Sequence, residues 1–188
     1  MYKLIPYSDD LDMTEFYTTA KERGFVNNAD RHMLVETIAK EDEWQVWMLL
    51  YNDRIVGSTA AHSFPEMGAD SYRIAARTCV LTDKLEGMTY GQGLRGISVI
   101  TKHQNPTAQF LIPACIDWAP KDAKLYITSN ENEAGTQRRV HNIFGPALQK
   151  LGVMTPVKNL HYRGTDQTVW HFNQHKFYEQ LNLHGRWQ

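Results

Sequence analysis

Cysteine and long apolar runs are scarce in this sequence of 188 residues. Its two cysteines, Cys79 and Cys115, both lie in apolar surroundings, so we expect reduced, buried thiols and a cytoplasmic location. No stretch approaches the ~20 apolar residues of a membrane-spanning helix, and the first residues lack the pattern of a secretory signal. We therefore expect no membrane partner.

An excess of charge of either sign is also absent. The chain has 20 Lys and Arg against 21 Asp and Glu, which gives a net charge of −1. This balance gives no strong nucleic-acid signal, because a nucleic-acid-binding domain is usually strongly basic. Internal repeats and linkers are absent too, and the length suits one domain that covers residues 1–188.

The first half of the chain contains several β-rich runs. A short strand at residues 2–7 precedes two helices, one from Ser8 to Arg23 and one over residues 31–40. Strands follow at 44–51, 54–62 and 71–81, and the turn Asn52-Asp53 joins the first two into a hairpin. On the third strand, strict alternation places one set of side chains on a single face: Tyr72, Ile74, Ala76, Thr78 and Val80.

The second half alternates helices and strands. We expect helices at 97–102, from Asn105 to about 118 with a kink at Pro113, from 134 to 151 with Gly152 as its end, and at 174–181. Strands are expected at 125–129, 154–162 and 168–172, the last two joined across 163–166. The fold class is α/β (α+β), with a central mixed, mostly antiparallel sheet of about seven strands and helices on both faces.

A glycine-rich stretch, Tyr90 to Gly96, stands between the fourth strand and the following helix. Glycines expose backbone N–H groups, and a helix that starts there adds its dipole, so the stretch predicts a phosphate site. Its G-x-G-x-x-G spacing also occurs in dinucleotide-binding proteins. That motif should follow a strand directly inside a βαβ unit, whereas residues 82–90 do not have a strand pattern, so the dinucleotide reading is the weaker alternative.

This order of elements resembles the GNAT superfamily of acyl-CoA-dependent N-acyltransferases over nearly the whole chain. The central glycines of the family's loop signature stand here in Tyr90-Gly91-Gln92-Gly93-Leu94-Arg95. The family's pattern of an asparagine, an alanine and a later glycine after the fifth strand is similar to Asn130, Ala134 and Gly152.

The resemblance implies N-acetyl transfer from acetyl-CoA, as cosubstrate, to an amine acceptor of unknown class by direct attack in a ternary complex. It implies that the fourth and fifth strands diverge and that pantetheine lies in the gap. The implied cofactor-binding residues are Cys79, Val80, Leu81, Gly91, Gln92, Gly93, Leu94, Arg95, Gly96 and Asn130. The residues proposed for acid and base catalysis are His141, Asp83 and Glu86.

Two alternatives stay open at this point. Tyr90 and Arg95 replace the family's usual residues, and its helix tyrosine is absent, so a catalytically inactive binding or assembly module is the second hypothesis. A homodimer is compatible with the sequence. No metal site is expected, because His171 and His175 have helical spacing but His171 falls on a predicted strand.

Overall fold

A computed structural model of the protein describes residues 1–22, 39, 43–81, 106–130 and 144–183. A seven-stranded sheet runs through it in the order β1-β2-β3-β4-β5-β7-β6. Neighbouring strands are antiparallel except for β4 and β5, which are parallel. The mixed, mostly antiparallel sheet is therefore confirmed. Its strands are β1 Tyr2–Pro6, β2 Trp44–Tyr51, β3 Arg54–Ser63, β4 Ser71–Val80, β5 Lys124–Asn130, β6 Met154–Tyr162 and β7 Thr165–Phe172.

Two tight turns set the hairpin registers. Asn52 and Asp53 have φ of 48° and 62°, and Arg163 and Gly164 have φ of 50° and 79°. Positive φ at both central positions is the geometry whose twist matches paired strands. The first turn was predicted. The second is shorter than predicted, because Tyr162 already pairs with Thr165.

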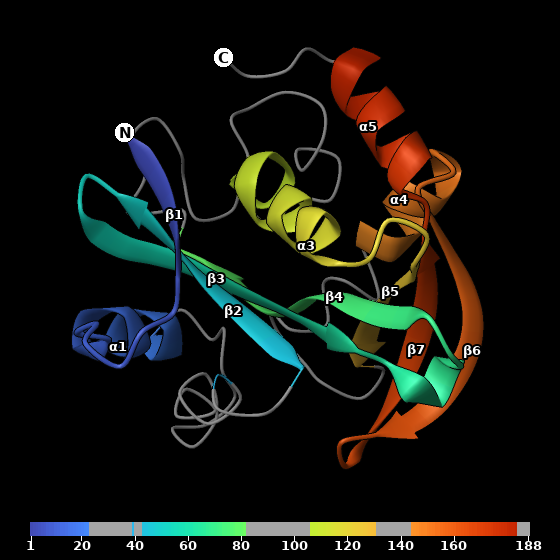
Figure 1. Ribbon diagram of the computed structural model, residues 1–188, viewed down its shortest axis with the longest axis horizontal. Helices are drawn as coiled ribbons and strands as arrows, with labels where there is room; N and C mark the ends of the chain where they lie inside the picture. Colours follow the sequence, from blue (N-terminus) through green and yellow to red (C-terminus); the bar gives the residue numbers. More distant parts are fainter. Residues whose placement is uncertain (23–38, 40–42, 82–105, 131–143, 184–188) are drawn as a thin grey trace.

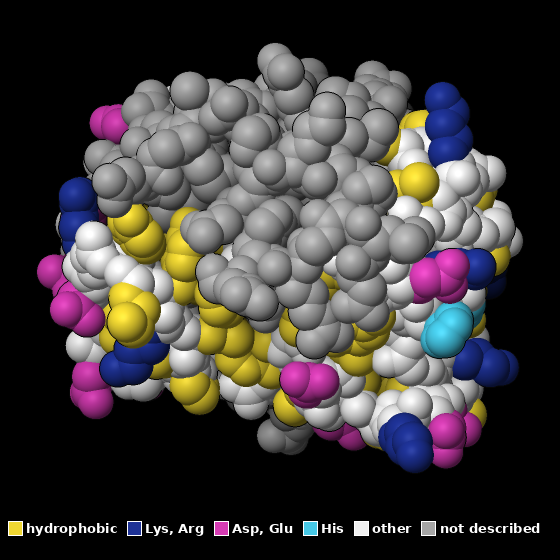
Figure 2. Space-filling view, turned by 90° about the horizontal axis from the view of Figure 1, so that it is seen from above, with side chains coloured by type: hydrophobic (Ala, Val, Ile, Leu, Met, Phe, Trp, Pro, Cys, Tyr) yellow, Lys and Arg dark blue, Asp and Glu magenta, His cyan; other side chains and the backbone are white. Residues whose placement is uncertain are grey.

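Helices cover both faces of the sheet, as predicted. In Figure 1, α3 (Ile112–Trp118) and α5 (Gln174–Leu183) lie above the sheet and α1 (Thr14–Glu22) lies below it. The short helix α4 (Gly145–Lys150) joins the upper layer through Leu148, in the same apolar cluster as Cys115 and Phe177. Seen from the α3 side, most of the described charged side chains lie toward the left and right margins of the molecule, and hydrophobic side chains form a band between them (Figure 2).

The two faces have separate apolar cores. Ile74, Cys115 and Trp170 belong to the core between the sheet and the upper helices, whereas Phe16 and Met48 belong to the core under α1. Within the described residues, every helix is too short or too polar to span a bilayer.

The first helix begins later than predicted. It starts at Thr14, where the Asp12 carboxylate accepts the backbone N–H of Thr14 at 3.0 Å. The hydroxyl of Ser8, predicted to cap the helix, instead accepts the N–H of Asp10 at 3.3 Å in a preceding turn. Short polar side chains compete with the helix in this way, which explains the displaced start.

The predicted disturbance at Pro113 takes the form of a wide turn. A π-helical segment, Thr107–Leu111, precedes α3, and the N–H of Ile112 bonds to the carbonyl of Thr107. Such a turn relieves the helix at a residue that has no N–H to donate. Gly152, with φ of 73°, ends α4 as predicted. The predicted helix at 97–102, the predicted helix at 31–40 apart from residue 39, which lies in a turn, and residues 134–143 of the helix predicted at 134–151 lie outside the described residues.

β4 does not keep the strict alternation that was predicted. Between Ser58 and Ala60 on β3 there are two steps, while β4 covers three, from Cys79 to Ala76; the same mismatch recurs from Ala76 to Arg73. Ala75 and Arg77 therefore form bulges, with φ of 51° and 53°. As a result Ile74 packs in the upper core and Ala76 in the lower one, so the single-face prediction was wrong.

Candidate functional site

The two parallel strands separate soon after they meet. β4 and β5, both described over their whole length, pair only at Ser71 with Lys124, Tyr72 with Leu125 and Arg73 with Tyr126. β4 continues to Val80 and β5 to Asn130, each held instead by its other neighbour. The rest of their facing edges therefore presents backbone groups that the partner strand does not satisfy, and an extended ligand can bind to such an edge.

The end of β4 aims its backbone groups in alternate directions. The N–H of Leu81 bonds to the carbonyl of Val56 at 2.7 Å, toward β3. Because successive residues of a strand point their N–H and C=O groups to opposite sides, the backbone groups of Val80 face the open edge. Of the three predicted residues Cys79, Val80 and Leu81, Val80 is thus the one whose backbone groups are directed toward the open edge.

The two thiols are buried and unreactive. Burial raises the pKa of Cys79, and it raises the pKa of Cys115 to about 11. Since the thiolate is the nucleophilic form, neither side chain is suited to carry an acyl group at neutral pH.

Other predicted site residues lie outside the described residues. These are Asp83, Glu86, His141 and the loop Gly91, Gln92, Gly93, Leu94, Arg95 and Gly96. Asn130 is the last residue of β5, where it pairs with Gln167 of β7 at the end of the strand that diverges from β4. His171 lies on strand β7, as predicted, and His175 lies on helix α5, so the two residues do not share one helix.

A polar row that was not predicted crosses three strands on the lower face. Trp44 of β2 pairs with His62 of β3, and His62 pairs with Arg73 of β4. The indole and imidazole rings stack with centroids 3.8 Å apart and planes 13° apart. His62 and Arg73 are 3 % and 9 % exposed, so this row is an interior feature at the position where β4 leaves β5.

Arg73 is a buried cation whose contacts with the described residues are all with neutral groups. Its Nε donates to the Thr128 hydroxyl at 2.9 Å, its Nη1 donates to Nε2 of His62 at 3.3 Å, and its Cζ lies 5.3 Å from the ring centroid of Tyr162. Within the described part of the chain, no carboxylate contacts it. Burial lowers the pKa of Arg73 to about 10, and Arg77 and Arg163 lower it further, against a raising contribution from Tyr162.

His62 is held in its neutral form. Arginine can only donate, so Nε2 accepts from Arg73, and Nδ1 carries the proton that it donates to the Ser63 carbonyl at 2.6 Å. Burial first, then Arg73, Arg163 and Arg77, lower its pKa to about 3, although the bond to Ser63 opposes them. Both ring nitrogens are occupied, so His62 is poorly placed to act as a base.

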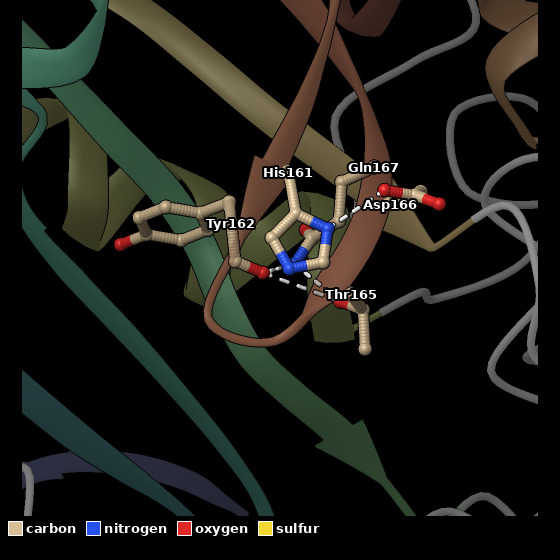
Figure 3. A network of polar contacts seen from close by, with 5 residues as sticks. All are labelled: His161, Tyr162, Thr165, Asp166 and Gln167. Carbon is tan, nitrogen blue, oxygen red and sulfur yellow. Dashed lines mark hydrogen bonds and ion pairs between the residues drawn. The ribbon is translucent and has the colours of Figure 1, made fainter.

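The β6–β7 turn brings a second arginine to this row. Arg163 is exposed, its Cζ lies 4.7 Å from the ring centroid of Trp44, and its Nε donates to the Tyr162 hydroxyl at 3.2 Å. Figure 3 shows the neighbouring residues of the hairpin, where the Tyr162 ring points away from the pair formed by His161 and Asp166. That pair is 2.8 Å apart.

Hydrogen bonds of the Gln167 side chain stabilise the β6–β7 hairpin. The amide of Gln167 donates to the Tyr162 carbonyl and to the Thr165 hydroxyl, each at 3.0 Å (Figure 3). These bonds fix the turn between the two strands, so the position of Arg163 is set by a rigid hairpin rather than by a long loop.

A sequence signal for this row is faint. The turn at Asn52-Asp53 indicates that β2 and β3 pair, and thus that Trp44 and His62 lie at the same end of the hairpin. The position of Arg73 beside His62 depends on the two extra residues in β4. The bulges at Ala75 and Arg77 contain no glycine that would indicate them in the sequence. Strict alternation without bulges therefore predicts a different register for Arg73.

Comparison with known proteins gives a consistent result at the level of the fold. No family model and no curated protein matches the chain. Among solved structures, a protein of Desulfovibrio desulfuricans assigned to the GNAT family of acetyltransferases superposes with a TM-score of 0.58 at 10% identity, over 92% of this chain and 99% of that chain. A probable acetyltransferase from Staphylococcus epidermidis gives 0.55 at 13%, over 92% and 98%.

A third solved structure contains a bound cofactor. The aminoglycoside acetyltransferase AAC(6')-Ib, in complex with coenzyme A, superposes with a TM-score of 0.59 at 9% identity, over 95% of this chain and 98% of that chain. At such identities the likeness establishes architecture and not individual side chains. This chain has the acyl-CoA N-acyltransferase fold of the GNAT acetyltransferases.

Proposed function

We propose that the protein transfers an acetyl group from acetyl-CoA to an amine. The observation that carries this proposal is the separation of β4 from β5 after Arg73 and Tyr126, within a sheet of GNAT architecture. An acyl-CoA cosubstrate fits this geometry, because pantetheine is an extended amide chain and the backbone of Val80 faces the open edge. The glycine stretch Gly91 to Gly96 would then bind the pyrophosphate.

The reaction needs few side-chain steps. The neutral amine attacks the thioester carbonyl, the C–S bond breaks, and the proton lost from nitrogen is balanced by one that the departing thiolate accepts. Positioning of the two reactants supplies several kcal/mol of the barrier reduction. Asp83 and Glu86 are proposed to take the proton from the amine, directly or through water, and His141 to protonate the thiolate.

A transfer assay tests the proposal. Purified protein is mixed with acetyl-CoA and a panel of amines, and release of free thiol is followed together with the mass of the acetylated product. A matched pair of variants locates the cofactor: Gly93→Asp places negative charge against the proposed phosphate site, and Gln149→Glu adds the same charge on an exposed position of α4. Gly93→Asp should abolish transfer, and Gln149→Glu should not.

The outcomes separate the alternatives. Thiol release that depends on an amine and is lost in Gly93→Asp supports acetyl transfer. Binding of acetyl-CoA without transfer to any amine in the panel identifies a binding module instead. Transfer that survives Gly93→Asp shows that the phosphate site lies elsewhere in the chain.

A further inference from the structure

The lower face of the sheet gathers positive charge where β4 and β5 part. Arg73 lies at the last paired position, and its side chain reaches across to Thr128 of β5. Arg163 approaches the row of Trp44, His62 and Arg73 from the β6–β7 turn, with its guanidinium group over the ring of Trp44. Arg77 stands four residues after Arg73 on β4, close enough for its charge to act on both Arg73 and His62.

This arrangement is costly unless something compensates it. A buried guanidinium loses its hydration, and among the described residues Arg73 contacts only neutral partners, namely a hydroxyl, a neutral imidazole and an aromatic ring. The nearby arginines repel it further. Apolar replacement is usually no less stable than such an uncompensated charge, so a structural role in folding explains the cluster poorly.

Binding of an anion explains the cluster better. Guanidinium groups have the fork geometry that matches carboxylate and phosphate oxygens. The aromatic rings of Trp44 and Tyr162 hold Arg163 at 4.7 and 5.7 Å from their centroids, which orients its charge toward the row. Arg73 and His62 are buried and Arg163 is exposed, so the cluster combines a buried cation with an exposed one that an anion can reach from solvent.

We propose that the amine acceptor carries an anionic group, carboxylate or phosphate, which binds to Arg73 and Arg163 on the lower face of the sheet. This inference rests on the proposed acetyl transfer, since it names the substrate class of that site. The anionic group binds beside the point where β4 and β5 separate, and the amine of the same molecule extends toward the open edge. Polycationic amines are disfavoured by the same charges.

A binding experiment tests the inference without relying on turnover. The probes are N-acetyl amino acids with small, aromatic and acidic side chains, each compared with its neutral carboxamide, and N-acetylethanolamine phosphate compared with N-acetylethanolamine. Calorimetric titrations are made with the protein alone and with saturating CoA. The anionic member of at least one pair should bind about tenfold to a hundredfold more tightly than its neutral partner. The carboxylate and phosphate pairs distinguish the two anions.

Variants assign the effect to the arginine cluster. Arg163→Asn removes the exposed cation and suits the positive φ of this turn position. It should weaken the anionic probe about tenfold and leave its neutral partner and CoA unchanged. Lys158→Gln removes an exposed positive charge from the same hairpin, away from the row, and should change nothing.

The outcomes keep this inference separate from the proposed function. Equal binding of anionic and neutral members in all pairs, or no binding of any anionic probe, overturns the inference, as does tighter binding of spermidine than of every anion. These results leave the CoA titration intact as a test of acetyl transfer. If CoA fails to bind, the proposed function fails, and the titrations with protein alone still decide whether the arginine cluster binds anions.

Discussion

Arg73 donates a hydrogen bond from Nη1 to Nε2 of His62 at 3.3 Å, while Nδ1 of His62 donates to the carbonyl of Ser63 at 2.6 Å. This pair fixes the tautomer of the imidazole and uses both of its nitrogens. It also explains why a histidine next to the separated strands is not the expected catalytic base. Its role is to support Arg73 from one side as Thr128 does from the other.

The stability of the protein should depend on pH through His62. Its pKa is about 3 in the folded protein against 6.5 when unfolded, so between these values the unfolded chain binds the extra proton. Stability is therefore lost as the pH falls below about 6.5, by roughly 2.7 kcal/mol at about pH 4.5. His62→Gln, which cannot be protonated, should lose less stability over this range in chemical denaturation. An identical pH dependence in both proteins would contradict the assignment.

The charge of Arg73 should be visible in the titration of His62. Arg73→Met removes the largest electrostatic contribution to the low pKa, so the pKa of His62 should rise, yet stay below 6.5 because burial persists. The measurement is an NMR titration of the His62 ring proton. Arg163→Asn, which removes a weaker contribution, should give a smaller rise. An unchanged pKa in Arg73→Met would show that the two side chains do not interact as described.

The cysteines should be dispensable for transfer. Cys79→Ala and Cys115→Ala remove buried thiols with raised pKa values, so acetyl-transfer rates should stay within about twofold, with a stability cost of about 1 kcal/mol each. Mass spectrometry of the protein incubated with acetyl-CoA should show no acetylated cysteine. Loss of transfer in a variant that still folds and binds acetyl-CoA would indicate a covalent intermediate.

At least one of the proposed acid and base residues should control turnover. Among Asp83→Asn, Glu86→Gln and His141→Gln, we expect one or more to lower kcat by about 10² to 10⁴, without loss of acetyl-CoA affinity. Asp117→Asn and Glu179→Gln, two exposed carboxylates on α3 and α5, serve as controls. If all three variants keep kcat within about twofold, proton transfer in this protein depends on other groups.

Local sequence signals predicted much of the sheet. Residues 44–51 form β2 as predicted, because a β-rich run ends at a turn pair, Asn52-Asp53, that suits positive φ. The start of α1 was harder to predict, because Ser8 and Asp12 both have side chains that can cap a helix. Which of the two caps the helix depends on their competition for backbone N–H groups. The residue types alone do not show whether Ser8 or Asp12 caps the helix.

The row formed by Trp44, His62 and Arg73 could not be predicted from local sequence patterns. Trp44, His62 and Arg73 are far apart in sequence, and they meet only through strand register. The register of β4 depends on bulges at Ala75 and Arg77, and these residue types do not indicate a bulge in the sequence. The glycine loop and the proposed acid and base residues lie outside the described residues, so for them the sequence prediction stands as a prediction.

Thermal unfolding with acetyl-CoA, CoA and NAD in parallel is the sharpest test of whether this protein binds an acyl-CoA. A ligand at about 100 times its Kd stabilises a protein by about 2.7 kcal/mol, which raises the Tm by several degrees for a chain of this size. We expect acetyl-CoA and CoA to raise the Tm of the unmodified protein and NAD to leave it unchanged. Gly93→Asp should abolish the response, and Gln149→Glu should keep it. No shift with either coenzyme A form, or a shift with NAD alone, would contradict the proposed acyl-CoA binding.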